Sequence, residues 1–307
     1  MDKNTKLAVA AGAAMVGIYT IQFVAARFSL REHLTPMDVT VLRFAGACAV
    51  FAMVLSIRGA ASVTALGWQK AIILTMLAGL PYPLVINWGL SYAPAAHAAA
   101  LCPASIVCFS FLFSRMFLGE SISSERMIGI ACVGAGLAFF TIGGGASSPV
   151  VLFGNLLFVG SGAMFSAYAV LVRRWAVDPI GAAAATVFLS CAVLPFLPML
   201  MPTGIDAASR FEIAAQVVIQ GFLAGAAAMF LFTYIVTQLG PQSASLFMPC
   251  VPMATAVAGA FLLGEKLSGG QIAAIGLVAA GMSFPAIQRL VWSQTKSGSR
   301  SRPRHRV

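Results

Sequence analysis

Arg43 is the residue whose type and position most directly suggest binding chemistry. It lies about six positions inside an apolar run that covers residues 37–57. A charged side chain at that depth in a membrane is costly and usually faces a cavity or a partner. A guanidinium group placed there can hold a carboxylate or a phosphate. Two structural roles compete with this interpretation, because Arg43 can also extend to the interface or pair with Asp38.

Aromatic and amide side chains in other apolar runs supply further candidates for substrate binding. Asn87 and Trp88, together with Tyr82, offer an amide and aromatic faces, which a pocket for an amphipathic ligand requires. His97 is suited to proton exchange near neutral pH, although a structural interfacial histidine is the commoner case. The remaining candidates are Tyr19, Gln22, Tyr168, Tyr234 and Gln238.

The reactive residue types form no catalytic or metal-binding pattern. The six cysteines lie in apolar runs without a CxxC pair, and the three histidines are scattered. All nine carboxylates fall in predicted loops or at the ends of runs, so coupling through a mid-membrane carboxylate is disfavoured. We therefore predict no enzyme activity, no catalytic residue, no metal and no cofactor. Transport, if any, is facilitated, or is coupled through His97 or the charge of the substrate.

The composition is that of a membrane protein. Sixty per cent of the residues are hydrophobic and nine per cent are charged, whereas a soluble domain has about 25% charged residues. Several apolar runs reach about 18 to 22 residues, enough to cross a hydrocarbon core about 30 Å thick as a helix. We predict an all-α, multi-pass integral protein of the cell membrane (an inner or plasma membrane).

The apolar runs predict ten membrane spans, and the first is expected to be an uncleaved helix. Their approximate ranges are 7–29, 37–57, 68–91, 95–117, 126–144, 151–174, 180–201, 212–237, 241–263 and 270–292.

The distribution of cations predicts that both termini are cytoplasmic. With the N-terminus inside, 14 Lys and Arg residues fall on the cytoplasmic side and 4 on the outer side. Six of the 14 lie in the last 19 residues, which form a basic tail over 293–307 and the end of the last span. Such a tail is expected to contact anionic lipid, and no nucleic-acid partner is predicted.

One stretch occurs twice. The sequence from Phe117 to Ser123, which contains Gly119 and Glu120, returns 145 residues later with Gly264 and Glu265. A self-match at this period indicates two five-span repeats, over 1–146 and 147–292. Because five is odd, the second repeat must enter the membrane from the opposite side, so the repeats are inverted.

The repeated glutamates are expected on opposite faces, so they cannot form one acid/base site. A structural role fits them better, with each glycine ending a helix. Pro103 and Pro249 are expected to bend the fourth and ninth spans and to line a cavity or act as hinges. The glycine-rich fifth and tenth spans predict close helix packing, in the scaffold or in a homodimer.

These residues resemble the drug/metabolite transporter superfamily, in particular its EamA-type ten-helix permeases, along nearly the whole chain. The similarity rests on Leu-Gly-Glu at 118–120 and 263–265, the segments 92–99 and 239–245 that lead into the fourth and ninth spans, and the prolines that follow. Arg43 also resembles an arginine of that family's second helix. The chain departs from the family pattern at His97, where a small or uncharged polar residue is usual.

The resemblance implies two five-helix bundles around a central cavity and the export of small metabolites such as amino acids. Inverted repeats independently favour alternating access, with the substrate held near the midplane between them. We therefore predict a secondary transporter whose partners are the bilayer and a small-molecule substrate. A channel or a non-transporting scaffold is the alternative, and an intramembrane enzyme is less favoured still.

Overall fold

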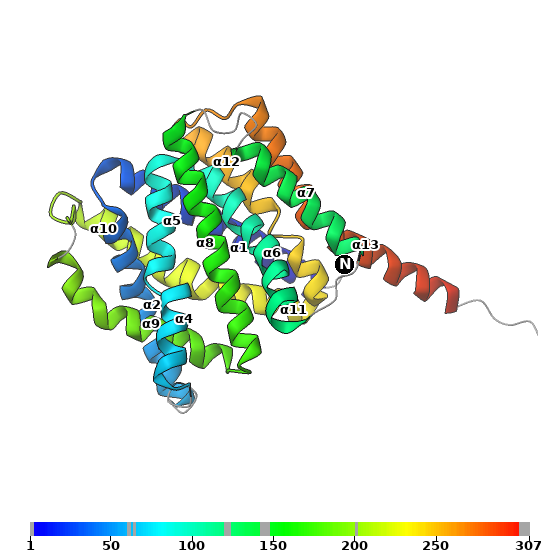
Figure 1. The fold of residues 1–307 in the computed structure, drawn as a ribbon, viewed down its shortest axis with the longest axis horizontal. Coiled ribbons are helices and arrows are strands. Elements are labelled where there is room, and N and C mark those ends of the chain that lie inside the picture. Colours follow the sequence, from blue (N-terminus) through cyan, green and yellow to red (C-terminus); the bar gives the residue numbers. More distant parts are fainter. Residues whose placement is uncertain are drawn as a thin grey trace, which may run out of the picture.

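The computed structural model describes residues 3–59, 63, 66–119, 124–141, 148–199 and 202–300, and helices are the regular elements in these ranges (Figure 1). The first half contains α1 (Lys3–Glu32), α2 (Pro36–Arg58), α4 (Trp68–Ala78), α5 (Pro81–Tyr92), α6 (Ala95–Leu118) and α7 (Ser124–Thr141). The second half contains α8 (Pro149–Arg174), α9 (Pro179–Val193), the 3₁₀-helix η1 (Leu194–Met199), α10 (Arg210–Gln216), the π-helix η2 (Val217–Ala227), α11 (Ala228–Ser245), α12 (Cys250–Leu263) and α13 (Gly269–Arg300).

Seven helical segments of the described chain are long and apolar enough to cross a membrane. They are Asn4–Glu32, Pro36–Ile57, Trp68–Tyr92, Ala95–Leu118, Pro149–Arg174, Pro179–Leu197 and Arg210–Leu239. Three shorter apolar helices, Met127–Phe140, Cys250–Leu263 and Gly269–Phe284, fall where the fifth, ninth and tenth spans were predicted. The protein is therefore a helical, multi-pass membrane protein, and length and composition alone identify seven of the ten predicted spans.

The third predicted span is divided into two helices. α4 ends at Ala78, and α5 begins at Pro81 after a break at Gly79 and Leu80. Proline suits the first position of a helix, where its missing N–H has no helical acceptor in any case. The freed N–H of Leu80 donates instead to the hydroxyl of Ser190 on α9, over 3.0 Å.

The start predicted for the ninth span is wrong. α11 runs through residue 241 to Ser245, and α12 begins only at Cys250. Pro249 is therefore the N-cap of α12 and does not bend the span from within. Pro252 lies in the first turn of α12, where backbone N–H groups have no helical partner. These two prolines favour a helix start at 250, because neither removes a hydrogen bond there.

The repeated motif ends a helix in both halves. Gly119 and Gly264 are the C-caps of α6 and α12, with φ of 66° and 64° in the left-handed region that favours glycine. Ser268 and Gln271 then form a reciprocal capping box before α13, with distances of 2.7 and 3.2 Å. Glu120 lies outside the described residues.

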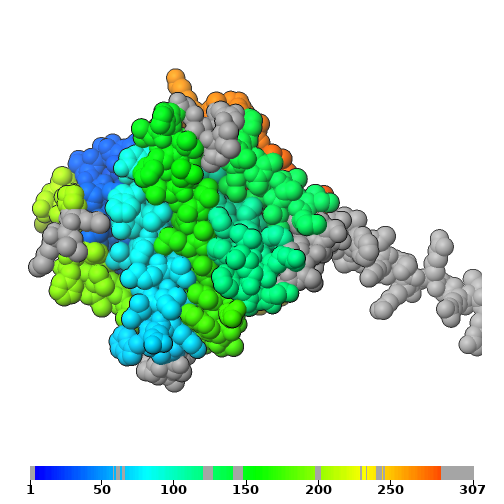
Figure 2. Space-filling model, viewed as in Figure 1, coloured from blue at the N-terminus to red at the C-terminus, as the bar shows by residue number. Residues whose placement is uncertain are grey.

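The helices of the two halves pack against one another along their lengths. Figure 2 shows α8 at the surface as a band that separates α4 and α5 from α6 and α7. The glycine-rich α7 and α13 contact each other within this chain, and a Cβ atom at Gly136 would come within 2.6 Å of Val278. Close packing of the fifth and tenth spans therefore occurs within one chain, and a homodimer stays a prediction.

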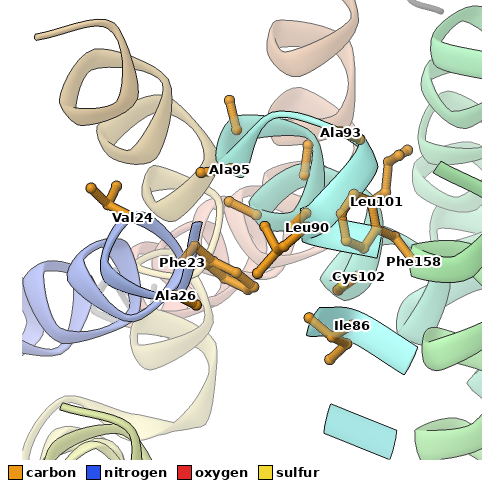
Figure 3. Packing of buried hydrophobic residues seen from close by; sticks show 14 of the residues in the cluster. Phe23, Val24, Ala26, Ile86, Leu90, Ala93, Ala95, Leu101, Cys102 and Phe158 are labelled. Atoms are coloured by element: carbon orange, nitrogen blue, oxygen red, sulfur yellow. The ribbon is translucent and has the colours of Figure 1, made fainter. Parts of the chain in front are cut away.

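The main buried cluster lies where α1, α5, α6 and α8 meet. Figure 3 shows Phe23 of α1 beside Leu90 of α5, with Leu101 of α6 near Phe158 of α8. Residues 95–102 at the start of α6 are all buried. The small side chains of this stretch allow neighbouring helices to approach α6 closely.

α2 and η2 cross at two facing glycines. A Cβ atom added at Gly46 would lie 2.8 Å from the Cα atom of Gly221, and one at Gly221 would lie 2.5 Å from that of Gly46. Both distances are shorter than real Cβ contacts. The side chains that flank this crossing, Arg43 on α2 and Gln220 on η2, are held together only if the backbones stay this close.

We predict that Gly221→Ala pushes α2 and η2 apart and destabilises the protein by about 1–3 kcal/mol, as overpacking does. The measurement is the thermal denaturation midpoint of the purified protein in detergent. Gly160→Ala on α8 is the matched control, because a Cβ atom there meets nothing within 4 Å. An unchanged midpoint for Gly221→Ala would contradict the close crossing.

Candidate binding cavity

A cavity of about 440 Å³ lies between the two halves of the chain. Its wall receives residues from α1, α2, α4, α5 and α6 of the first half and from α8, α9, η2 and α12 of the second. This volume lies within the range of about 300–1,000 Å³ that is usual for small-molecule sites. The polar residues of the wall are Tyr19, Gln22, Arg43, Tyr82, Asn87, Tyr168, Thr186 and Gln220.

Arg43 faces this cavity and not an acidic partner. Its guanidinium Nη1 donates to Oε1 of Gln220 over 3.3 Å. The carboxylate of Asp38, the partner considered from the sequence, is bound by the hydroxyl of Thr203 at 2.7 Å and the backbone N–H of Gly204 at 2.8 Å. The predicted alternative of an Arg43–Asp38 pair is therefore not formed.

Gln220 is presented to Arg43 by a π-helix. Its Nε2 donates to the backbone carbonyl of Gln22 over 3.0 Å, which turns Oε1 toward the guanidinium. π-Helical turns are rare and are frequent at functional sites. Ala224 and Gly225, one turn further along η2, also line the cavity. The irregular segment of the eighth span therefore forms part of the wall.

Asn87 and a row of aromatic rings complete the polar and apolar walls. The buried Nδ2 of Asn87 donates to the hydroxyl of Thr40 over 3.0 Å. The rings of Tyr82, Phe165 and Tyr168 follow one another with centroid separations of 5.3 and 5.7 Å. The site thus joins amide groups and one cation to an extended aromatic surface.

Four residues predicted to bind substrate do not line this cavity. Trp88 is 38% exposed on the outside of the bundle, and Tyr234 and Gln238 of α11 also lie away from the cavity wall. His97 is fully buried, with its Nδ1 2.9 Å from Oδ1 of Asn155 and its ring against Phe140. The helical faces decide this outcome, because none of these side chains borders the cavity, and His97 instead packs against Asn155 of α8 elsewhere between the halves.

A charged cluster closes the end of the bundle at which α1 and α12 terminate, called here the Glu265 end. Oε1 of Glu265 lies 3.4 Å from Nε of Arg27 and 3.4 Å from Nη2 of Arg31. Its Oε2 accepts the backbone N–H of Ala95 over 3.1 Å. Pro94 offers α6 no side-chain cap, so a carboxylate from the other half caps this helix.

The surrounding backbone accommodates this charged cluster in two ways. Arg27 also donates to the carbonyl of Leu90 at the end of α5. A Cβ atom at Gly259 would lie 2.9 Å from Oε2 of Glu265, so the absence of a side chain there lets the carboxylate approach α12. A further contact at this end joins Nδ1 of His33 to a carboxylate oxygen of Glu212 over 3.4 Å, and it is an ion pair when the imidazole is protonated.

An apolar layer separates the cluster from the cavity. Phe23, Ala26 and Leu90 are buried and line the cavity, and Figure 3 shows Phe23 and Leu90 side by side. The charged cluster contacts the same two helices just beyond this layer, through Arg27 and the carbonyl of Leu90. An apolar layer and an ionic layer therefore lie in series between the cavity and the Glu265 end.

The comparison with protein families decides what kind of protein this is. The model of the EamA-like transporter family matches the chain twice, over residues 6–142 and 152–285. The chain belongs to the EamA-like transporter family. The resemblance drawn from the repeated Leu-Gly-Glu motif is thereby confirmed, together with the two-repeat organisation, and the protein is a membrane protein of a transporter family.

Solved structures show the same fold for this EamA-like chain. One crystal structure matches it with a TM-score of 0.60 at 21% sequence identity, covering 93% of this chain and 99% of the other. No curated protein sequence matches the chain. Within the described ranges, no group of three or more His, Cys, Asp or Glu side chains could hold a metal ion.

Sequence reasoning missed two polar wall residues of this EamA-like protein. Gln220 lies in the middle of the predicted eighth span, and a polar residue at that depth is the same signal that identified Arg43. Thr186 gives a weaker signal, because a threonine hydroxyl in a helix commonly bonds to the preceding turn, as it does here to Ala182 over 2.8 Å.

We predict that Asn155→Ala destabilises the protein without changing solute affinity. The substitution removes the partner of His97 and the donor to the carbonyl of Phe140, and leaving a buried polar group unpaired costs about 1–3 kcal/mol. Thermal denaturation and a solute titration on the same preparation check this. If Asn155→Ala instead weakened solute binding and left the stability unchanged, His97 would have to be counted among the substrate-binding residues.

Proposed function

We propose that this protein is a secondary transporter that exports small metabolites, such as amino acids or related compounds, by alternating access between two inverted repeats. The observation that carries the proposal is the cavity itself, whose wall is shared by helices of both repeats. A site at such an interface can be exposed to either side of the membrane when the repeats move relative to each other.

The proposed orientation places both termini in the cytoplasm of a cell with this protein in its inner or plasma membrane. The excess of cations in the loops assigned to the cytoplasm supports it. In this orientation the Glu265 end faces outward, and we assign the described conformation to a state closed to the outside. The cations assigned to the outer side include Arg27 and Arg31, whose charges are partly balanced by Glu265.

We predict that the purified protein in liposomes exchanges at least one labelled metabolite across the membrane, with and without a pH gradient. Stimulation of uptake by unlabelled solute on the opposite side distinguishes a carrier from a channel, since a channel gives no such exchange. A panel of amino acids, organic acids, nucleosides and sugars supplies the solutes. Absence of flux for every solute, in both directions, would count against the proposed function.

A cavity-filling variant makes this test specific to the site. Ala183 of α9 lines the cavity, whereas Ala10 of α1 is exposed and does not line it. Ala183→Trp is expected to reduce flux to the background of protein-free liposomes, because the indole occupies the solute's space. Ala10→Trp adds the same group and is expected to keep the flux of the unmodified protein.

We predict that Glu265→Gln opens the Glu265 end. Charge-assisted hydrogen bonds contribute about 1.5–3 kcal/mol each, and loss of about 1.4 kcal/mol from the closed state raises the open population about tenfold. Cys102 lines the cavity and reports this change in a variant that lacks the other five cysteines. Its labelling by an impermeant maleimide added outside whole cells should accelerate about tenfold.

Glu32→Gln is the matched control, because Glu32 lies at the same end of α1 and is exposed. It removes the same charge and should leave the labelling rate of Cys102 unchanged. Equal acceleration in both variants would assign the effect to surface charge, and no acceleration in Glu265→Gln would contradict the role of the cluster in closure.

A further inference from the structure

The charge inside the cavity is unbalanced. Among the described residues of the wall, Arg43 is the one with a charged side chain. Its hydrogen-bond partner, Gln220, is neutral, and no carboxylate of the described residues forms an ion pair with Arg43. A buried charge without a counter-ion is unfavourable, so a ligand that brings one negative charge is favoured.

The guanidinium of Arg43 is positioned to receive such a group. One nitrogen is engaged by Gln220, which is itself fixed by its bond to the backbone of Gln22. An arginine side chain has five N–H donors in a planar fork, so donors remain for the two oxygens of a carboxylate. The Gly46–Gly221 crossing holds the helices that carry Arg43 and Gln220 in this arrangement.

The described wall of the cavity has neutral acceptors, such as Oε1 of Gln22, but no group that would balance the charge of an ammonium. No carboxylate belongs to its described wall, and the two acids that are buried in the described part of the chain are engaged elsewhere. Asp38 is bound by Thr203 and Gly204, and Glu265 by Arg27, Arg31 and Ala95. The ammonium of an amino acid would therefore meet the like charge of Arg43 without a counter-ion, which penalises a zwitterion relative to a simple carboxylate.

The rest of the wall suits an apolar body. The aromatic row of Tyr82, Phe165 and Tyr168 faces the same space as Phe51 and Val187. Flat apolar surfaces of this kind bind aromatic or branched aliphatic groups by burying their surface. A phosphate monoester carries about 1.5 to 2 negative charges, which one guanidinium does not balance. A monoanion fits the charge of the wall better.

We infer that the cavity takes organic monocarboxylates that have an aromatic or branched aliphatic body and no ammonium group, with the carboxylate on Arg43. This inference rests on the proposed transport function and narrows its substrate class to carboxylates related to amino acids, excluding the amino acids themselves. Arg43 and Gln220 set the preference for the anion, and the aromatic row sets the preference for the body.

The test compares four probes that share one phenylalkyl body and differ in charge. They are 3-phenylpropionate, its neutral amide, zwitterionic phenylalanine and cationic phenethylamine. Half-saturating concentrations come from thermal stabilisation of the detergent-solubilised protein, and exchange rates come from liposomes corrected for protein-free leak. We expect 3-phenylpropionate to bind at least about tenfold more tightly than phenylalanine, which corresponds to about 1.4 kcal/mol, and the amide and the amine to bind more weakly than the carboxylate.

Variants of Arg43 assign this preference to the guanidinium. Arg43→Gln should bring the carboxylate and the amide to equal affinity, while Arg43→Lys should keep part of the preference because it keeps the charge but loses the planar fork. Arg115→Gln is the matched control, since Arg115 is an exposed residue of α6 outside the cavity. It should bind all four probes as the unmodified protein does.

The outcomes separate the inference from the proposed function. Tighter or equal binding of phenylalanine, a carboxylate preference that survives Arg43→Gln, or binding of none of the probes while another solute is exchanged would overturn the inference and leave transport standing. Carboxylate binding that depends on Arg43, without exchange of any solute, would support the anion site and count against transport.

Discussion

The carboxylate of Glu265 is the contact on which the closed end of this protein depends. It belongs to the second repeat, yet it accepts hydrogen bonds from the N-terminus of α6 and from two arginines of α1, all in the first repeat. Without it, the N-terminus of α6 would lose its cap, and the largely buried Arg27 would lie beside the partly exposed Arg31 without a counter-ion, which is unfavourable. The apolar layer of Phe23 and Leu90 lies between this charged cluster and the cavity. The side chain of Arg27, which contacts both Glu265 and the carbonyl of Leu90, connects the cluster to the helices that line the cavity.

The two repeats share a sequence pattern but do not have the same helix boundaries. Gly119 and Gly264 end α6 and α12 in the same left-handed conformation. Upstream, Pro94 caps the start of α6, whereas α11 continues through the corresponding proline at 241 and the chain breaks at 246–249 instead. α6 is consequently 24 residues long and α12 only 14. An alternating mechanism needs two related repeats that have different conformations at the same time. In such a mechanism, access changes sides when each repeat takes up the conformation that the other repeat had before.

Much of the helical architecture, and part of the site, could be predicted because the signals are local. The length of an apolar run predicts a span, a glycine after it predicts the helix end, and the depth of Arg43 predicts a cavity-facing cation. The position of His97 could not be predicted, because burial against Asn155 and Phe140 depends on residues about 40 to 60 positions away. The same holds for Glu265, whose partners lie 170 or more residues away in the chain. Nothing near residue 265 distinguishes a surface turn from a buried cap.

The arrangement of charges also bears on how transport is driven. His97 lies outside the cavity and the described wall carries no carboxylate, so of the coupling routes considered from the sequence, the charge of the substrate is the one that remains at the site. On the proposed function, a bound monocarboxylate neutralises the positive charge of Arg43. After its release, the empty cavity again carries one positive charge. An inside-negative membrane potential then favours export, because moving one negative charge outward releases about 2.3 kcal/mol per 100 mV. On the proposed function, the membrane potential therefore drives the export of a monocarboxylate, and Arg43 supplies the group that holds its charge in the cavity.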